Sequence, residues 1–162
     1  MVNTPEEARQ VADDQKQKGA DFIKVYDRLS RDAYFAIMDE SRRRNISVAG
    51  HVPFTISAWE ATAAKQTSIK QLRQIPLACS SREEELWPKV VVTKSKKERA
   101  QLMLAISRSY SGEKCQRLFA EFKKNGTWVE PTMTVSRAFS MMDDPQFTND
   151  NRLRYFDGEA RR

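Results

Sequence analysis

Apolar and polar positions follow two different periods along the first half of the chain. Residues 20–26 and 46–53 are short runs rich in β-branched and aromatic side chains, as buried strands are. Residues 67–72 form a weaker run of the same kind. Helical spacing of apolar residues predicts helices before, between and after these runs, over residues 4–18, 30–45 and 56–65. This alternation of helix and strand predicts an α/β fold built from βα units around a parallel sheet.

Capping residues predict where several helices begin. Thr4 is followed by a proline and, three residues later, by Glu7, which is a capping-box pattern. Ser30 precedes the second helical stretch and is a suitable N-cap. The pattern Ser-x-x-Glu occurs at Ser81 and again at Ser95, so we expect a short and a long helix to begin there.

The second half of the chain is mainly helical by its pattern. A long helix is predicted over residues 95–124, with a break at residues 111–112 in its middle. Its second part carries one apolar stripe at positions i, i+3, i+4 and i+7, namely Cys115, Leu118, Phe119 and Phe122. An Asn-Gly pair at residues 125–126 ends this helix, and residues 127–133 are a predicted fourth strand. Residues 141–162 are polar.

Length and composition indicate one globular domain. The chain has 162 residues, of which 40% are hydrophobic and 31% charged. We therefore predict a single domain over residues 1–162, with residues 1–140 as its core and residues 141–162 as a polar C-terminal tail. No apolar run approaches the roughly 18 residues of a membrane-spanning helix, which argues against a membrane protein.

Cysteine usage favours a cytoplasmic protein. Cys79 and Cys115 lie far apart and form neither a CxxC unit nor a disulfide framework. Each is expected to be a buried apolar side chain, which suits a reducing compartment. The N-terminal residues also lack the basic start and the apolar stretch of a signal peptide.

Net charge modestly favours acidic partners. The formal charge is +6, from 28 Lys and Arg against 22 Asp and Glu. The basic groups at residues 42–44 and 94–97 lie at predicted helix ends and are not interleaved with aromatic residues. Their placement argues against nucleic-acid binding.

Two polar residues lie where apolar strands should end. Lys24 is inside the run 20–26, and His51 follows three small or apolar residues of the next strand. Functional side chains of parallel α/β sheets cluster at the carboxyl ends of strands, so these two residues are candidates for one site. Each also fits a structural role, Lys24 as a solvent-directed strand-end residue and His51 as a hydrogen-bonded loop residue.

Several segments resemble the middle of the metal-dependent amidohydrolase superfamily, in particular its imidazolonepropionase- and prolidase-like branch. They are Pro5–Arg9, Gly19–Tyr26 and Ala49–Pro53. Asn125–Val129, together with Pro131-Thr132, is similar to the seventh strand of that branch. The resemblance implies that the four predicted strands are strands four to seven of an eight-stranded TIM barrel, which together form a half barrel.

The resemblance also implies a role for both candidate residues. Lys24 matches the strand-four lysine, which is carboxylated in binuclear members and bridges two divalent metals. His51 matches the strand-five histidine ligand. In an active member, zinc or another divalent metal would polarise an amide carbonyl and supply the attacking hydroxide.

This sequence departs from the family pattern at most other site positions. The strand-one His-x-His pair and the strand-eight aspartate have no counterpart within residues 1–162. In the strand-six motif, Gln71 stands where relatives have a metal-binding histidine, and Lys70 stands in place of an acid. We therefore expect a vestigial metal site of Lys24 and His51, no tightly bound metal, and no residue to which catalysis can be assigned.

Three functions follow as hypotheses. The first is an amidohydrolase-like fragment without autonomous catalysis. The alternatives are a metal-dependent hydrolase of C–N bonds that a second chain completes, and a non-catalytic binding module. Because a half barrel exposes two strand edges and an inner face, we predict a homodimer and expect Phe22, Val25 and Val48 to be partly exposed in a single chain. The rival is a monomer whose long helix folds over the open face.

Overall fold

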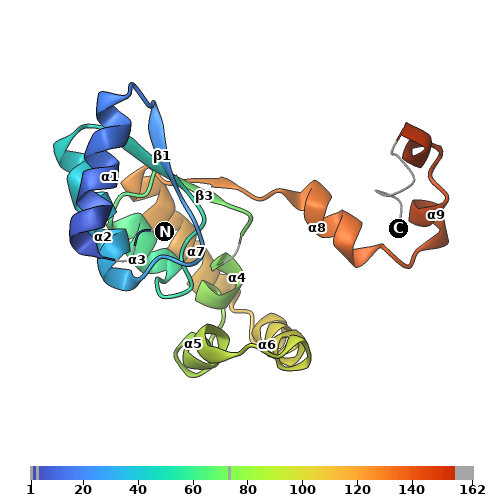
Figure 1. Cartoon of the computed structure of the whole chain (residues 1–162). Coiled ribbons are helices and arrows are strands. Elements are labelled where there is room, and N and C mark those ends of the chain that lie inside the picture. Colours follow the sequence, from blue (N-terminus) through green and yellow to red (C-terminus); the bar gives the residue numbers. More distant parts are fainter. Residues whose placement is uncertain (1, 3, 73, 156–162) are drawn as a thin grey trace. The chain divides into compact units, whose positions relative to one another are not determined.

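The structure, a computed structural model, describes residue 2, residues 4–72 and residues 74–155 (Figure 1). The chain divides into two compact units, Met1–Pro131 and Thr132–Arg162. Among the described residues, no helix is both long and apolar enough to span a membrane. Residues 156–162 of the predicted tail lie outside the described residues.

The first unit contains one parallel sheet of four short strands. These are β1 (Phe22–Val25), β2 (Ser47–Gly50), β3 (Ser68–Lys70) and β4 (Trp128–Glu130). The strands are arranged in the order β1-β2-β3-β4, and each neighbouring pair is parallel. The predicted α/β fold with four parallel strands is therefore confirmed, although every strand is shorter than its predicted run. β1 and β4 are edge strands that pair on one side only within the described residues.

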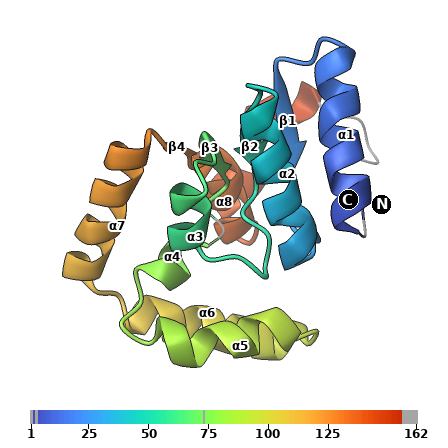
Figure 2. The ribbon, with the colours of Figure 1, turned by 90° about the vertical axis from the view of Figure 1, so that its left-hand side faces the viewer.

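Helices connect the strands in the order expected of βα units. The helices of the first unit are α1 (Pro5–Gln17), α2 (Arg31–Arg43), α3 (Ala58–Ala63), α4 (Ile75–Ala78), α5 (Glu83–Val92), α6 (Lys96–Arg108) and α7 (Gly112–Asn125). The last four of them form the connection between β3 and β4. Figure 2 shows α1 beside α2, and α5 beside α6.

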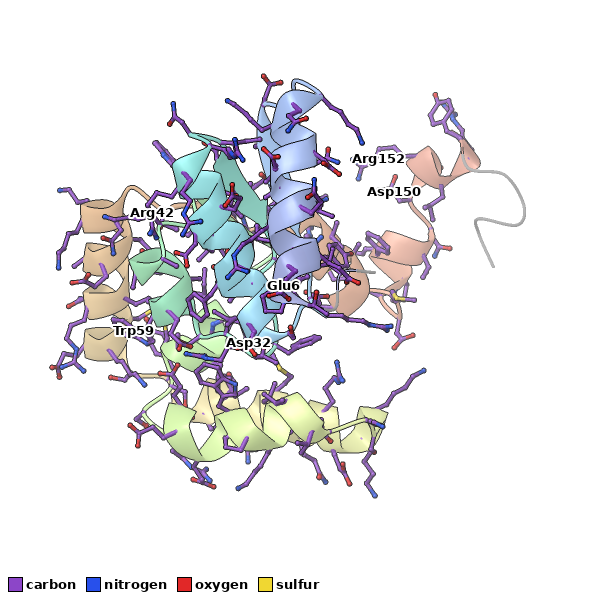
Figure 3. All side chains as sticks on the ribbon, turned by 60° about the vertical axis from the view of Figure 1, so that its left-hand side comes forward. Glu6, Asp32, Arg42, Trp59, Asp150 and Arg152 are labelled. Atoms are coloured by element: carbon purple, nitrogen blue, oxygen red, sulfur yellow. A yellow bond between two sulfur atoms is a disulfide. The ribbon has the colours of Figure 1, made fainter. Side chains whose placement is uncertain are left out.

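The second unit is a series of short helices. Its elements are α8 (Met133–Ser140), α9 (Pro145–Thr148) and a 3₁₀ helix (Asn151–Tyr155). The last two of these elements lie in the segment that was predicted only as a polar tail. Arg152 and Asp150, both labelled in Figure 3, form an ion pair at 2.5 Å within this unit.

Helix termini follow the capping rules at most predicted positions. The Thr4 capping box is confirmed, because the Thr4 hydroxyl accepts from the Glu7 N–H at 3.2 Å and the Glu7 side chain accepts from the Thr4 N–H. The Ser30 and Ser95 side chains cap α2 and α6. Charges complement the helix dipole in α2, with Asp32 in its first turn and several arginines, including the labelled Arg42, near its end (Figure 3).

The prediction of a capping box at Ser81 is wrong. α5 begins at Glu83 instead, because the hydroxyls of two neighbouring serines are used elsewhere. Ser80 accepts from the Arg82 N–H, and Ser81 donates to the carbonyl oxygen of Ser109 at 3.1 Å. Both hydroxyls therefore fasten a turn rather than cap a helix.

One face of the sheet is covered by helices and the other is open. Ile23 and Val25 of β1 are buried in the main core, whereas Phe22, which precedes Ile23, is 51% exposed. Trp128 of β4 is 76% exposed. The expectation that Val25 and Val48 are partly exposed is wrong, because alternation along the strands turns both toward the helices.

The predicted break in the long helix is confirmed. Ser111 caps a separate helix, α7, which ends at Gly126 in a left-handed conformation. Leu118 and Phe122 of α7 are buried in the same core as Ile23, so α7 packs on the covered face of the sheet. The rival arrangement, in which this helix covers the open face, is therefore not observed.

Candidate functional site

The two candidate residues lie at the carboxyl ends of neighbouring strands. In the β1–β2 register, Lys24 is paired with Ala49 and Val25 with Gly50. His51 follows directly, and its N–H donates to the Val25 carbonyl oxygen at 3.1 Å. The fold thus brings Lys24 and His51 to the same edge of the sheet, as the sequence predicted.

Gly50 places His51 by allowing the two strands to approach closely. Its φ is +125°, a conformation that residues with a side chain rarely adopt. A Cβ at this position would lie 2.2 Å from the Val25 carbonyl oxygen. Only glycine therefore lets β2 lie this close to β1 at the point where His51 begins the following loop.

The His51 imidazole is buried and fixed on two sides. Only 1% of the residue is exposed. Its Nδ1 lies 2.7 Å from Asp27 Oδ1, and its ring stacks on Tyr26 with 4.3 Å between centroids. Because an ionised carboxylate only accepts, Nδ1 is the nitrogen that donates to Asp27, and in the neutral tautomer with this donor Nε2 is the nitrogen with the lone pair. Sequence reasoning missed Asp27, although a carboxylate two residues beyond the strand was a usable signal.

Lys24 is exposed on the open face of the sheet. Its amine lies 6.0 Å from the centroid of the Tyr26 ring, the ring that also stacks on His51. Lys24 forms no ion pair with any residue that the structure describes. Tyr26 is therefore the contact that the two candidate residues share.

β3 and β4 contribute charged residues at their carboxyl ends. The Lys70 amine lies 2.7 Å from a carboxylate oxygen of Glu130, its partner in the strand register. The positive charge that Lys70 adds to the site is therefore compensated. Gln71 has a positive φ of 64°, and its N–H donates to the Glu130 carbonyl oxygen at 2.8 Å. Gln71 is thus held at this edge, one residue beyond β3.

A buried glutamine fastens the central strands. Gln66 is fully buried, and its amide nitrogen donates to the carbonyl oxygens of Gly50 at 3.1 Å and Ser68 at 3.0 Å. The Tyr34 hydroxyl donates to the Gln66 amide oxygen at 2.8 Å. Burial raises the pKa of Tyr34 above its usual range, so the phenol keeps the proton that it donates. Nothing in the sequence distinguishes Gln66 from an ordinary loop residue.

The residues present fit a divalent metal only in part. His51 matches the usual arrangement of a metal-binding histidine, whose second ring nitrogen donates to a carboxylate. Lys24 would become an anionic donor only after carboxylation, because the unmodified amine is cationic near neutral pH. No cluster of three or more His, Cys, Asp or Glu residues suited to a metal occurs in the described part of the chain. The donor set of this chain is therefore incomplete.

The prediction of two unpaired cysteines is wrong. Cys79 and Cys115 form a disulfide, with their Cα atoms 4.5 Å apart. Both residues are buried, as expected, but helix packing places α4 and α7 next to each other and brings the sulfurs together. The cysteine-based argument for a reducing compartment therefore no longer holds.

Comparison with known proteins gives a distant likeness to a solved structure. No protein-family model matches the chain, and no curated protein matches it. The chain is similar to a solved structure titled "AH, Bottromycin amidohydrolase", with 15% sequence identity and a TM-score of 0.42. The match covers 78% of this chain and 47% of that one, so this chain spans about half the length of that structure. A likeness at this level does not establish a family.

Proposed function

We propose that the chain is amidohydrolase-like, with an incomplete, vestigial metal site of Lys24 and His51 and no catalytic activity of its own. One observation carries the proposal. His51 is buried at the carboxyl end of β2 with Nδ1 bonded to Asp27 at 2.7 Å, on the same sheet edge as Lys24. This arrangement leaves Nε2 as a donor for a metal and adds a second potential donor nearby.

Two donors are fewer than an active zinc enzyme uses. Catalytic zinc sites have three protein ligands and keep one position open for water. Gln71 offers only a neutral amide at the position where the resemblance implies a histidine. When bound, a divalent metal supplies a hydroxide nucleophile and polarises the carbonyl of the substrate. Within this chain, Asp27 keeps the proton on His51 Nδ1, and Tyr26 fixes the plane of the imidazole.

The first prediction concerns activity. The purified chain, supplied with zinc or manganese, is expected not to hydrolyse proline-containing dipeptides or lactams above the rate without protein. The reason is that the site lacks a third ligand and an assigned proton acceptor for the nucleophilic water. Product formation is measured by chromatography, with His51→Ala as the control. Turnover in the natural chain that disappears in His51→Ala would show that the site is complete enough to work.

A second candidate function is a metal-dependent hydrolase that a second chain completes. It is favoured by the two edge strands, β1 and β4, which pair on one side only within the described residues. A two-fold axis parallel to the strands would pair β1 of one copy with β4 of the other, and all strands would stay parallel. The open face would then become the inside of a barrel and cover Phe22, Tyr26 and Trp128, each more than half exposed in one chain.

The second prediction concerns this homodimer. Light scattering at micromolar concentration is expected to give twice the mass of one chain. The interface of this dimer is expected to bury more than the roughly 1,600 Å² of a standard complex. Phe22→Glu should shift the mass toward the monomer, since it places a charge on the face that a second copy would cover. Met103→Glu is the matched control, because Met103 is 50% exposed on α6, away from the sheet. A monomeric mass for the natural chain at all dilutions would rule out the dimer.

A further inference from the structure

Helices α5 and α6 form a hairpin that leaves the sheet unit after α4 and returns to it before α7 (Figure 2). The hairpin has a small apolar core that is distinct from the main one. This core consists of Leu77, Leu86 and Ile106, with Trp87, Val90, Leu102 and Ala105 packed against it. Leu77 belongs to α4, so this core also packs the hairpin against α4.

The attachment is a narrow neck, residues 79–81 and 109–111. Ser80 and Tyr110 form an isolated antiparallel bridge between the two segments. Two backbone hydrogen bonds flank this bridge. The Ser81 N–H donates to the Ser109 carbonyl oxygen at 2.7 Å, and the Ser111 N–H donates to the Cys79 carbonyl oxygen at 2.9 Å. The chain thus enters and leaves the hairpin through a single paired turn.

The Cys79–Cys115 disulfide closes this neck on the side of the main core. Cys79 is the C-cap residue of α4, and Cys115 is in the first part of α7. Their separation of 36 residues encloses the whole hairpin. A disulfide that closes a loop reduces the conformational freedom that the loop has when it is unfolded.

Non-covalent contacts reinforce the neck. The Lys114 amine lies 2.5 Å from the Glu83 carboxylate and donates to the Ser80 carbonyl oxygen at 2.9 Å. This ion pair is largely buried, with 21% of the Lys114 side chain and 10% of the Glu83 side chain exposed. The hydroxyl oxygens of Ser80 and Ser109 lie 2.6 Å apart. The disulfide is the covalent crosslink that is added to these contacts.

A cavity gives small thiols a route to the disulfide. A space of about 580 Å³ between α4, α6 and α7 is lined by both cysteines. Its other walls include Leu72, Tyr110 and Phe119. The last two are 63% and 49% exposed, so the cavity borders solvent.

The hairpin also touches the loop that follows His51. The indole N–H of Trp87 on α5 donates to the Phe54 carbonyl oxygen at 3.2 Å. The Phe54 N–H donates in turn to the carbonyl oxygen of Asp27 at 3.1 Å. Asp27 is the residue that fixes the His51 imidazole, so a continuous set of bonds joins the hairpin to the candidate site.

We propose that the Cys79–Cys115 disulfide is a redox-sensitive clasp for the α5–α6 hairpin. In the oxidised chain the clasp holds Trp87 against the loop after His51. In the reduced chain the hairpin opens while the sheet stays folded. Opening proceeds when a thiolate of a dithiol attacks one sulfur, which gives a mixed disulfide and releases the other cysteine. The second thiol of the dithiol then displaces the protein sulfur. The protein gains two electrons and two protons, and the dithiol becomes a disulfide.

The third prediction tests this clasp by hydrogen exchange of the full chain, with dithiothreitol as the dithiol. Thiol counting on denatured protein purified without reductant should find no free thiol before treatment and two after it. Reduction is then expected to speed amide exchange in α5 and α6 at least tenfold and to leave β1 and β2 unchanged. Two free thiols before treatment, unchanged exchange in the hairpin, or an equal increase in the sheet would each overturn the proposal.

Two variants separate the clasp from general destabilisation. A double variant with Cys79→Ser and Cys115→Ser should show the fast hairpin exchange without reductant and no response to dithiothreitol. Trp87→Phe keeps the disulfide and removes only the bond to Phe54, so it should speed exchange in the loop after His51 but not at the neck. If the double variant fails to fold, the comparison of oxidised and reduced natural chain still decides the question. Equal exchange in Trp87→Phe and the natural chain would contradict the link to the His51 loop.

Discussion

Replacing Gly50 with alanine is expected to lower the free energy of unfolding by about 4 kcal/mol, at the upper end of single-residue effects. The added Cβ would lie 2.2 Å from the Val25 carbonyl oxygen, and the neighbouring atom is backbone that no side-chain rotation can move aside. The two strands would have to separate, which breaks the ladder that places His51. The change is measured by urea denaturation followed by circular dichroism. Since domains are typically stable by only about 5–15 kcal/mol, the variant would lose between about a quarter and four fifths of that stability.

Gly126→Ala is the matched control for this variant. Gly126 also has a positive φ, of +72°, but a Cβ there would meet nothing within 4 Å. Its replacement therefore adds backbone strain without the clash and should lower the free energy of unfolding by about 1 kcal/mol. Similar losses for the two variants would mean that close approach of the strands is not what requires glycine at residue 50.

The order and type of the main elements could be predicted because local signals agree with the tertiary structure. Thr4, Ser30 and Gly126 mark helix ends by chemistry that acts within one turn, and all three act as predicted. Ser81 shows the limit of such signals. Its hydroxyl bonds to Ser109, which is close only after the hairpin has folded, and sequence spacing contains no information about that contact.

The site could be predicted only as far as strand ends reveal it. Lys24 and His51 are conspicuous because polar side chains interrupt or follow apolar runs, and parallel pairing brings such positions together. Asp27 and Gln66 were missed because each lies in a loop, where polar residues are common. Their roles depend on burial and on partners such as Tyr34 that are distant in the sequence.

The disulfide could not be predicted from cysteine spacing. Cys79 and Cys115 are 36 residues apart, and their proximity results from the way α4 and α7 pack after the α5–α6 hairpin has closed. From composition alone, two distant cysteines are expected to be buried apolar side chains. Both cysteines are indeed buried, but they are not unpaired. Two cysteines in a 162-residue chain carry no connectivity pattern of their own.

Replacing Gln71 with histidine is expected to create a tighter metal site. Gln71 is exposed, follows β3 directly and has a φ of 64°, a region in which histidine is more frequent than most residues. Gln71→His adds a second imidazole to the sheet edge at which His51 lies. Zinc binding, measured by titration calorimetry, should then become roughly tenfold tighter or more.

Two further variants make this result specific. Gln17→His places an imidazole on α1, far along the chain from the sheet edge, and should not change zinc binding. The double variant Gln71→His with His51→Ala should lose the gain, because one imidazole alone does not make a site. A gain that survives the loss of His51 would mean that the two positions do not share a metal.

Zinc content after dialysis, measured by elemental analysis together with the intact mass of the natural chain, tests whether Lys24 and His51 are an incomplete site. We expect less than one retained zinc per chain, an unmodified Lys24, and weak zinc binding in titration that is lost in His51→Ala. One or two metals retained per chain, with a carboxylated Lys24, would contradict it.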